Sequence, residues 1–210
     1  MIDNSVNNNQ TTEELILKAA EQEFMTKGFA GARTTSIAEA AGVTHAMFHY
    51  YFRTKEKLFD RIIAEKIKML INGLLTSVTD RDMSLNELIK NIIDRHLNFL
   101  SANPDLPNFV TREIYGNPDK VKILLDKLIV NAPVFLNIFQ EKIDRLAAEG
   151  VCRRVDARML MLDIASLNVL PFLAKPIVNG ALNNCMANMD EFIQIRKKEN
   201  YDTIMRKLKP

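Results

Sequence analysis

Residues 44–52 (THAMFHYYF) concentrate hydroxyl, imidazole and phenol side chains, which donate and accept hydrogen bonds. Phe48 and Phe52 lie one helical turn apart, so in a helix they share a face that points into a core. The other side chains then lie at the ends and on the outer face, where a short helix has no structural need of so many polar and aromatic groups. A helix that enters the major groove of DNA needs such groups. The predicted DNA-contacting set is Thr34, Thr35, Thr44, His45, Ala46, Met47, His49, Tyr50, Tyr51 and Lys55.

Several of these residues have a specific expected role. Tyr50 and Tyr51 are adjacent and cannot both face the core, so at least one hydroxyl points outward, where it reaches a phosphate. Lys55 opens the next helix, and a phosphate at that N-terminus would bind both the lysine and the unpaired backbone N–H groups. His45 and His49 have an i, i+4 spacing that suits zinc, but no third ligand follows nearby, so we expect neither a metal nor a cofactor. Contact with DNA is the preferred interpretation of both histidines, and an ordinary surface position is the alternative.

Two preceding elements must position this segment. Residues 34–41 (TTSIAEAA) predict a short helix with Thr34 or Thr35 as its N-cap, because a hydroxyl there accepts a hydrogen bond from an orphan backbone N–H. Gly42 stands where a helix ends in a left-handed residue, and Thr44 is placed to cap the following helix. A first helix, for which Thr12 is the expected cap, ends at Gly28. Together these helices predict a helix-turn-helix unit.

This part of the chain resembles the DNA-binding domain of the TetR family of bacterial regulators. The resemblance lies in LILKAAEQEFMTKGFAGARTTSIAEAAGV, FHYYF and TKEKLF, and it extends over about 45 residues in the order and spacing of the family pattern. The chain departs from the pattern at His49, where tyrosine is usual, at Tyr51, where histidine is frequent, and at Ala46, where glycine is common. These departures affect the operator sequence that the resemblance would imply, while DNA binding itself is still implied.

Composition excludes several classes of protein. The net charge of +2 is close to neutral, so the chain is no polybasic nucleic-acid binder, and attraction to phosphate must be local. The two cysteines, Cys152 and Cys185, have no metal-ligand spacing and suit a reducing cytosol. No apolar run approaches the roughly 18–20 residues that a membrane span needs. We therefore expect a cytoplasmic protein without a membrane partner. No motif of an enzyme active site is present, so we expect no catalysis.

The remaining chain reads as helix after helix, which predicts an all-α fold of about nine helices. We expect a disordered tail over residues 1–12, the helix-turn-helix domain over residues 13–58, and a helical ligand-binding and dimerisation body over residues 59–210. A helix from Thr54 to about Leu75 links the two parts. Later helices are predicted at Leu85–Ala102, Leu106–Tyr115, Val121–Ile129, Pro133–Glu149, from Val155 or Asp156 through the segment MLMLDIASLNVLPFLAKPIV, and from Asn188 or Asp190 to Leu208.

The body offers candidates for an apolar ligand pocket. Aromatic rings and a flexible methionine would line it, while a histidine and an asparagine would supply polar contacts. Ordinary core packing is the alternative for these residues, and for His96 it is the more frequent role. The predicted pocket residues are His96, Phe99, Phe109, Tyr115, Phe135, Phe139, Met161, Asn168 and Phe172.

The function expected from the resemblance is that of a homodimeric repressor. It would bind a palindromic double-stranded DNA operator and be released by an unknown small apolar effector. The long apolar segment that follows Val155 resembles the helices through which family members dimerise, although an internal core helix is the alternative. The short helix at Leu106–Tyr115 is expected to shift when the ligand binds. A transcriptional activator, or an architectural DNA-binding protein without ligand sensing, is the alternative function.

Overall fold

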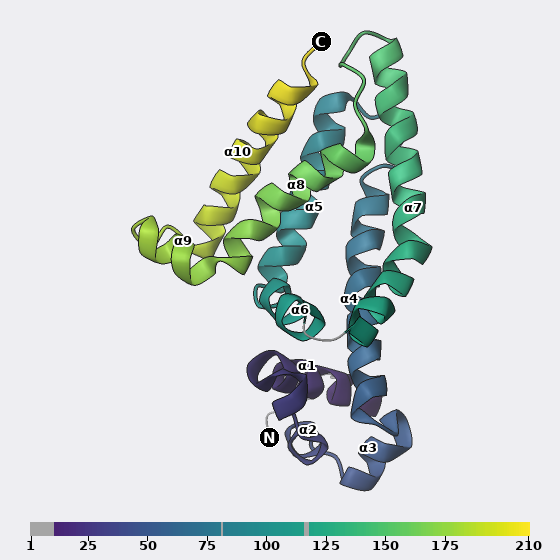
Figure 1. Ribbon diagram of the computed structural model, residues 1–210, viewed down its shortest axis with the longest axis vertical. Coiled ribbons are helices and arrows are strands. Elements are labelled where there is room, and N and C mark those ends of the chain that lie inside the picture. Colours follow the sequence, from purple (N-terminus) through teal and green to yellow (C-terminus); the bar gives the residue numbers. More distant parts are fainter. Residues whose placement is uncertain (1–10, 81, 116–117) are drawn as a thin grey trace, which may run out of the picture. The chain divides into compact units, whose positions relative to one another are not determined.

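The computed structural model describes residues 11–80, 82–115 and 118–210, and at 114–115, 118–121, 123–124, 127 and 129–131 it describes the backbone only. All regular structure within these residues is helical, which confirms the all-α fold (Figure 1). The described residues form ten helices, one more than the approximate number expected. They are α1 (Thr12–Gly31), α2 (Thr34–Ala40), α3 (His45–Phe52), α4 (Lys55–Thr76), α5 (Leu85–Ala102), α6 (Leu106–Tyr115), α7 (Pro118–Ala148), α8 (Ala157–Leu173), α9 (Lys175–Ala181) and α10 (Met189–Leu208).

The chain divides into two compact units, and the division falls inside α4, between Glu65 and Lys66. It lies later than the domain boundary at residue 58 that we expected from the sequence. The expected tail of residues 1–12 lies largely outside the described residues, which begin at Thr11. We call residues 11–65 the N-terminal unit and residues 66–210 the C-terminal unit.

Helix α1 begins with a capping box that the sequence analysis placed one residue too late. The N-cap is Thr11, not Thr12: its hydroxyl accepts a hydrogen bond from the Glu14 N–H at 3.3 Å, and a Glu14 carboxylate oxygen accepts one from the Thr11 N–H at 2.9 Å. A capping box needs a glutamate three residues after the cap, and Glu14 has that spacing from Thr11 alone.

The core of the N-terminal unit contains a cluster of aromatic rings. Gly28 has a left-handed φ of 71°, which breaks the helical path of α1 as the sequence predicts and turns Phe29 back. The ring of Phe29 lies 5.9 Å from that of Phe24 and 5.1 Å from that of Phe59. Such contacts between aromatic rings stabilise a small core beyond the area that they bury.

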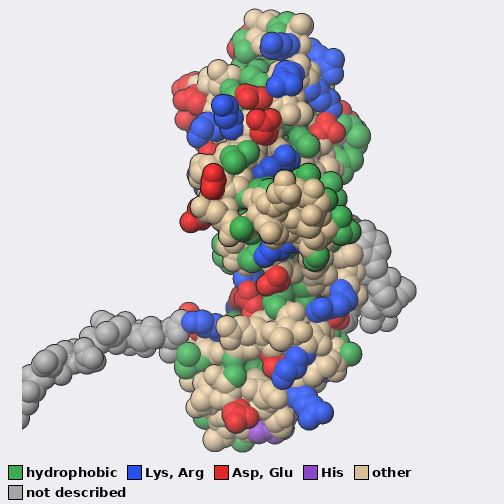
Figure 2. All heavy atoms as spheres, turned by 90° about the vertical axis from the view of Figure 1, so that its left-hand side faces the viewer, with side chains coloured by type: hydrophobic (Ala, Val, Ile, Leu, Met, Phe, Trp, Pro, Cys, Tyr) green, Lys and Arg blue, Asp and Glu red, His purple; other side chains and the backbone are tan. Residues whose placement is uncertain are grey.

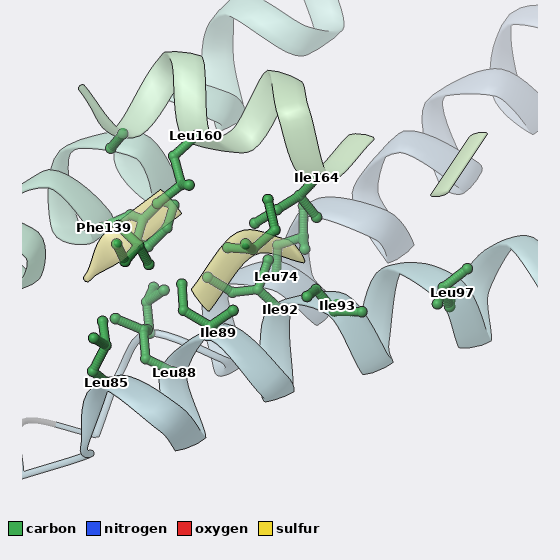
Figure 3. Close-up of a cluster of buried hydrophobic side chains, with 14 of the residues drawn as sticks. Leu74, Leu85, Leu88, Ile89, Ile92, Ile93, Leu97, Phe139, Leu160 and Ile164 are labelled. Carbon is green, nitrogen blue, oxygen red and sulfur yellow. The ribbon is translucent and has the colours of Figure 1, made fainter. Parts of the chain in front are cut away.

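The C-terminal unit is built around α5. One face of this helix is buried (Figure 3), and the helix packs against α8 and α10. Phe139 of α7 and Leu160 and Ile164 of α8 lie opposite that face, and all three have no exposed surface. The buried face of α5 comprises Leu85, Leu88, Ile89, Ile92, Ile93, His96, Leu97 and Leu100.

The prediction of separate helices at Val121–Ile129 and Pro133–Glu149 is wrong, because both belong to α7 with Pro133 in its interior. A proline inside a helix costs about 3 kcal/mol, since it removes one backbone hydrogen bond and crowds the preceding turn. Here a stripe of buried side chains continues after the proline. Phe135, Phe139, Ile143 and Leu146 are at most 5% exposed, and their burial offsets that cost.

Among the described helices, no single one is both long and apolar enough to cross a membrane. By length and composition the pair α8 and α9 would suffice together, but the two helices bend by 79° at the break between them.

Candidate nucleic-acid interface and predicted ligand pocket

The turn between α2 and α3 has the conformation that the sequence predicts. Gly42 has a φ of 67°, and the Val43 N–H donates to the Ala38 carbonyl at 3.0 Å, which closes the C-terminus of α2. Thr44 then caps α3, because its hydroxyl accepts a hydrogen bond from the Met47 N–H at 3.2 Å. These contacts fix where α3 begins.

Helix α3 separates its buried and exposed side chains sharply. Phe48 is fully buried and Phe52 is 7% exposed, while Tyr50 is 82% exposed and Tyr51 is 41% exposed. The two tyrosine rings meet edge to face, with their centres 5.2 Å apart. The other exposed residues of the predicted DNA-contacting set are Thr35, Thr44, His45, Ala46, Met47 and His49.

Two histidines link α3 to the residues before and after it. His45 Nε2 and the Thr34 hydroxyl form a hydrogen bond of 3.1 Å, and His49 Nδ1 lies 3.0 Å from the Arg53 carbonyl oxygen. The two imidazole rings meet edge to face at 4.4 Å. Histidine side chains accordingly reach the surface of the N-terminal unit (Figure 2, purple).

The predicted cap of α2 is wrong. Neither Thr34 nor Thr35 is the N-cap; Arg33 occupies that position and makes no side-chain capping hydrogen bond. Thr34 is instead the first residue of α2, with its hydroxyl bound to His45. Thr34 therefore helps to orient the side chain of His45, which the sequence predicts to contact DNA.

Lys55 has contacts within the protein that the sequence analysis missed. Its ammonium donates to the carbonyl oxygens of Phe29 at 2.8 Å and Ala32 at 3.0 Å, and it lies 4.6 Å from the centre of the Phe29 ring. Lys55 thus ties the start of α4 to the connection between α1 and α2. An ammonium has three N–H groups, so one is left for a phosphate, and the predicted phosphate contact stays a prediction.

Two residues of the predicted pocket, His96 and Asn168, meet in a buried polar network. The Asn168 amide donates to His96 Nδ1 at 3.1 Å, and the Asn200 amide donates to the Asn168 oxygen at 2.6 Å. The three side chains come from α5, α8 and α10 and are at most 4% exposed. Burial disfavours the charged imidazole and lowers the pKa of His96 to about 4.

Asn200 was not among the predicted residues, although the sequence carries a signal for it. It lies in the stripe of α10 that also contains Ile193, Ile204 and Leu208, which are all buried. A polar residue inside an apolar stripe requires a buried partner. The sequence does not reveal that this partner is Asn168.

The aromatic residues predicted for the pocket pack in the core. Phe135, Phe139 and Phe172 are at most 2% exposed, with Phe99 and Met161 partly buried against the same cluster. Phe109 of α6 is also buried. The side chain of Tyr115 lies outside the described residues.

The structure also contains a hollow that the sequence did not predict. It has a volume of about 430 Å³ and lies between α7 and the start of α8. None of the predicted pocket residues whose side chains are described borders it. Its lining residues are Pro133, Leu136, Asn137, Gln140, Asp156, Ala157 and Arg158.

Part of the sequence is similar to known regulatory proteins. Residues 16–62 match the model of the bacterial regulatory proteins of the tetR family. YdgC of Bacillus subtilis, an uncharacterized HTH-type transcriptional regulator, is 31% identical over 120 residues, which cover 55% of this chain and 59% of that protein. The HTH-type transcriptional repressor NicS of Pseudomonas putida is 35% identical over 104 residues, which cover 48% of this chain and 45% of NicS. The chain thus matches between about half and three fifths of the length of these two relatives.

The likeness in fold extends beyond the N-terminal unit. The structure of the transcriptional regulator FadR from Bacillus subtilis in complex with stearoyl-CoA has a TM-score of 0.62 and 18% sequence identity, and the match covers 87% of this chain and 96% of FadR. YdgC and FadR are described as transcriptional regulators and NicS as a transcriptional repressor. The helix-turn-helix unit thus matches the bacterial regulatory proteins of the tetR family over residues 16–62, and the helical chain as a whole has a fold like that of FadR.

Proposed function

We propose that this chain is a homodimeric repressor that binds a near-palindromic operator and leaves it when a small apolar molecule binds. The proposal assigns DNA binding to the N-terminal unit, dimerisation and ligand binding to the C-terminal unit, and the cytoplasm as the location. The observation that carries it is the surface of α3, where Tyr50 and Tyr51 are exposed beside the exposed His45 and His49. Exposed aromatic and polar groups on a helix anchored by buried phenylalanines suit insertion into the major groove.

The dimer is supported by the unusual composition of α8. Leu160 and Ile164 are fully buried on one side of this helix, yet Leu162 and Leu170 on other sides are 58% and 60% exposed. A helix that is apolar all round is normally covered all round. Ile177 beyond α8 is 73% exposed and extends the apolar surface. A second copy, related by a two-fold axis, would cover this surface with the same surface of its own.

Sedimentation velocity tests the dimer. The wild-type chain is expected to sediment as a dimer at micromolar concentration, and a variant with Leu162→Glu and Leu170→Glu as a monomer. Met69→Glu is the matched control, because Met69 is a 58% exposed apolar residue on a different helix, α4, and its replacement should leave the dimer intact. A monomeric wild-type chain, or a double variant that stays dimeric, would contradict this assignment.

The effector is proposed to bind within the C-terminal unit. The complex of FadR with stearoyl-CoA, a ligand whose acyl chain is apolar, supports a ligand with an apolar part for this fold. Helix α6 is the proposed moving part, because it is short. The Asn108 amide donates to the Phe172 carbonyl at 3.0 Å, which links α6 to α8. A ligand weakens operator binding only if it binds better to the conformation that binds DNA poorly.

Two measurements test the function. Selection from random DNA duplexes should return a two-fold repeat with half-sites about one helical turn apart, on the order of 34 Å. Fluorescence anisotropy of the selected operator should then report release on addition of stearoyl-CoA or one of a panel of fatty acids and aromatic compounds. A specific operator with no effector from any of these would favour an architectural DNA-binding protein, and no selected sequence at all would refute the proposal.

A further inference from the structure

The hydrogen bond of His49 determines which nitrogen of its ring carries the proton. Its Nδ1 lies 3.0 Å from the Arg53 carbonyl oxygen at the C-terminus of α3. A carbonyl oxygen only accepts hydrogen bonds, so Nδ1 must donate and therefore carries hydrogen. A neutral imidazole has one N–H group, which leaves Nε2 with an unshared electron pair. In its neutral form, His49 thus presents an acceptor on the side of the ring opposite Arg53.

The surrounding residues also hold the ring in place. The centre of the His49 ring lies 5.4 Å from that of the Phe48 ring and 4.4 Å from that of the His45 ring. In both pairs the ring planes are nearly at right angles. Phe48 is fully buried, and His45 is itself bound to the Thr34 hydroxyl. These contacts oppose a flip of the imidazole about its Cβ–Cγ bond, which would place Cδ2 instead of Nδ1 beside the Arg53 carbonyl oxygen. The exposed His49 is therefore oriented before any DNA binds.

A fixed acceptor distinguishes base edges in the major groove. Adenine N6 and cytosine N4 are amino donors there, whereas guanine O6 and N7 and thymine O4 are acceptors. An acceptor that faces another acceptor leaves both without a partner after water is excluded, and this is unfavourable. An asparagine or glutamine would offer a donor as well as an acceptor, but neutral His49 with this tautomer offers the acceptor alone.

We propose that His49 is a specificity-determining residue whose Nε2 accepts a hydrogen bond from the exocyclic amino group of an adenine or a cytosine in each operator half-site. This inference rests on the proposed function, because it requires α3 to enter the major groove. It goes further by stating which chemical group of the base is read.

Base analogues test the inference with the wild-type chain. An operator is first selected from random duplexes at pH 8. The position read by His49 is the one at which His49→Ala loses its base preference. If the base there is adenine, purine lacks the N6 amino group and 7-deazaadenine keeps it but lacks N7. If it is cytosine, pyrimidin-2-one lacks the N4 amino group.

Removal of the amino group should weaken wild-type binding about fivefold to tenfold per half-site, which is the effect of roughly one hydrogen bond. The 7-deaza analogue should bind as tightly as adenine. His49→Ala should bind the natural base and the analogue without the amino group equally well. Circular dichroism of this variant should match that of the wild type, because His49 is exposed.

Three outcomes would overturn the inference and leave the proposed function standing: wild-type affinity that does not change when the amino group of that base pair is removed, a loss of affinity with 7-deazaadenine but not with purine, or an operator whose base preferences His49→Ala does not alter. Failure to select any operator would instead refute the proposed function. The two failures are thus distinguishable.

Discussion

Replacement of Lys55 by methionine should loosen the N-terminal unit. The change keeps the apolar stem and removes the ammonium that donates to the carbonyls of Phe29 and Ala32 at 2.8 and 3.0 Å. Each of these two hydrogen bonds to a charged group contributes about 1.5–3 kcal/mol, so together they would contribute about 3–6 kcal/mol. Lys55 is only half-buried, however, and water would replace part of this contribution. We therefore expect a loss of about 2–3 kcal/mol, which is large for a unit of this size.

Hydrogen exchange followed by mass spectrometry measures this loss locally. Since 1.4 kcal/mol corresponds to a factor of ten, exchange of the amides in α2 and α3 should accelerate by roughly 30- to 150-fold. Lys57→Met is the matched control, because Lys57 lies on the same turn of α4 and is exposed, so exchange in that variant should stay at the wild-type rate. Unchanged exchange in Lys55→Met would refute the reasoning.

The same variant separates the structural role of Lys55 from its predicted contact with phosphate. If the third N–H group of the ammonium binds a phosphate, Lys55→Met should weaken binding to all DNA sequences alike. It should also reduce the slope of log affinity against log salt by about 0.9. An unchanged slope together with faster exchange would mean that Lys55 acts only within the protein.

Three further predictions concern stability. The pKa of His96 is lowered to about 4 from an ordinary 6.5, so the free energy of unfolding should fall by up to about 3 kcal/mol as the pH falls from 6.5 to 4, with little further loss from this group at lower pH. Urea denaturation of the wild type and of His96→Gln across this range tests the prediction. Asn168→Ala should cost about 2–4 kcal/mol in urea denaturation, since both His96 and Asn200 lose their buried partner; a change below about 0.5 kcal/mol would be inconsistent with the network. Gly42→Ala should destabilise by about 1 kcal/mol because φ is 67°, whereas Gly73→Ala, in a helix with no neighbouring atom within 4 Å of the added carbon, should stabilise by about 0.5–1 kcal/mol; equal thermal shifts for the two would contradict this.

Several features that depend on neighbouring residues were predictable from the sequence, although the N-caps of α1 and α2 were predicted wrongly. The turn at Gly42, the cap at Thr44 and the buried pair Phe48 and Phe52 follow from local rules, and the structure has each of them. The bounds of α5 also match, because the Ser84 cap before the helix and Asn103 after it are local signals.

Features that depend on distant residues were not predictable in the same way. The acceptors of Lys55 lie 26 and 23 residues earlier in the chain, and His96 lies 72 residues from Asn168, so no periodicity connects these groups. At Pro133 a local rule gave a wrong prediction, because distant contacts override it. The local rule that proline ends a helix is sound, but here burial of the side chains after it outweighs the rule. The arrangement of the aromatic residues in the core likewise depends on packing between helices.

The structure of the full chain bound to its selected operator tests the central claim most directly. We expect α3 to lie in the major groove of each half-site, with Tyr50 or Tyr51 at a phosphate and His49 at a base edge. Two copies should contact each other through the apolar surface of α8 and the residues that follow it. A complex in which α3 faces away from the DNA, or in which a single copy occupies the operator, would contradict the account.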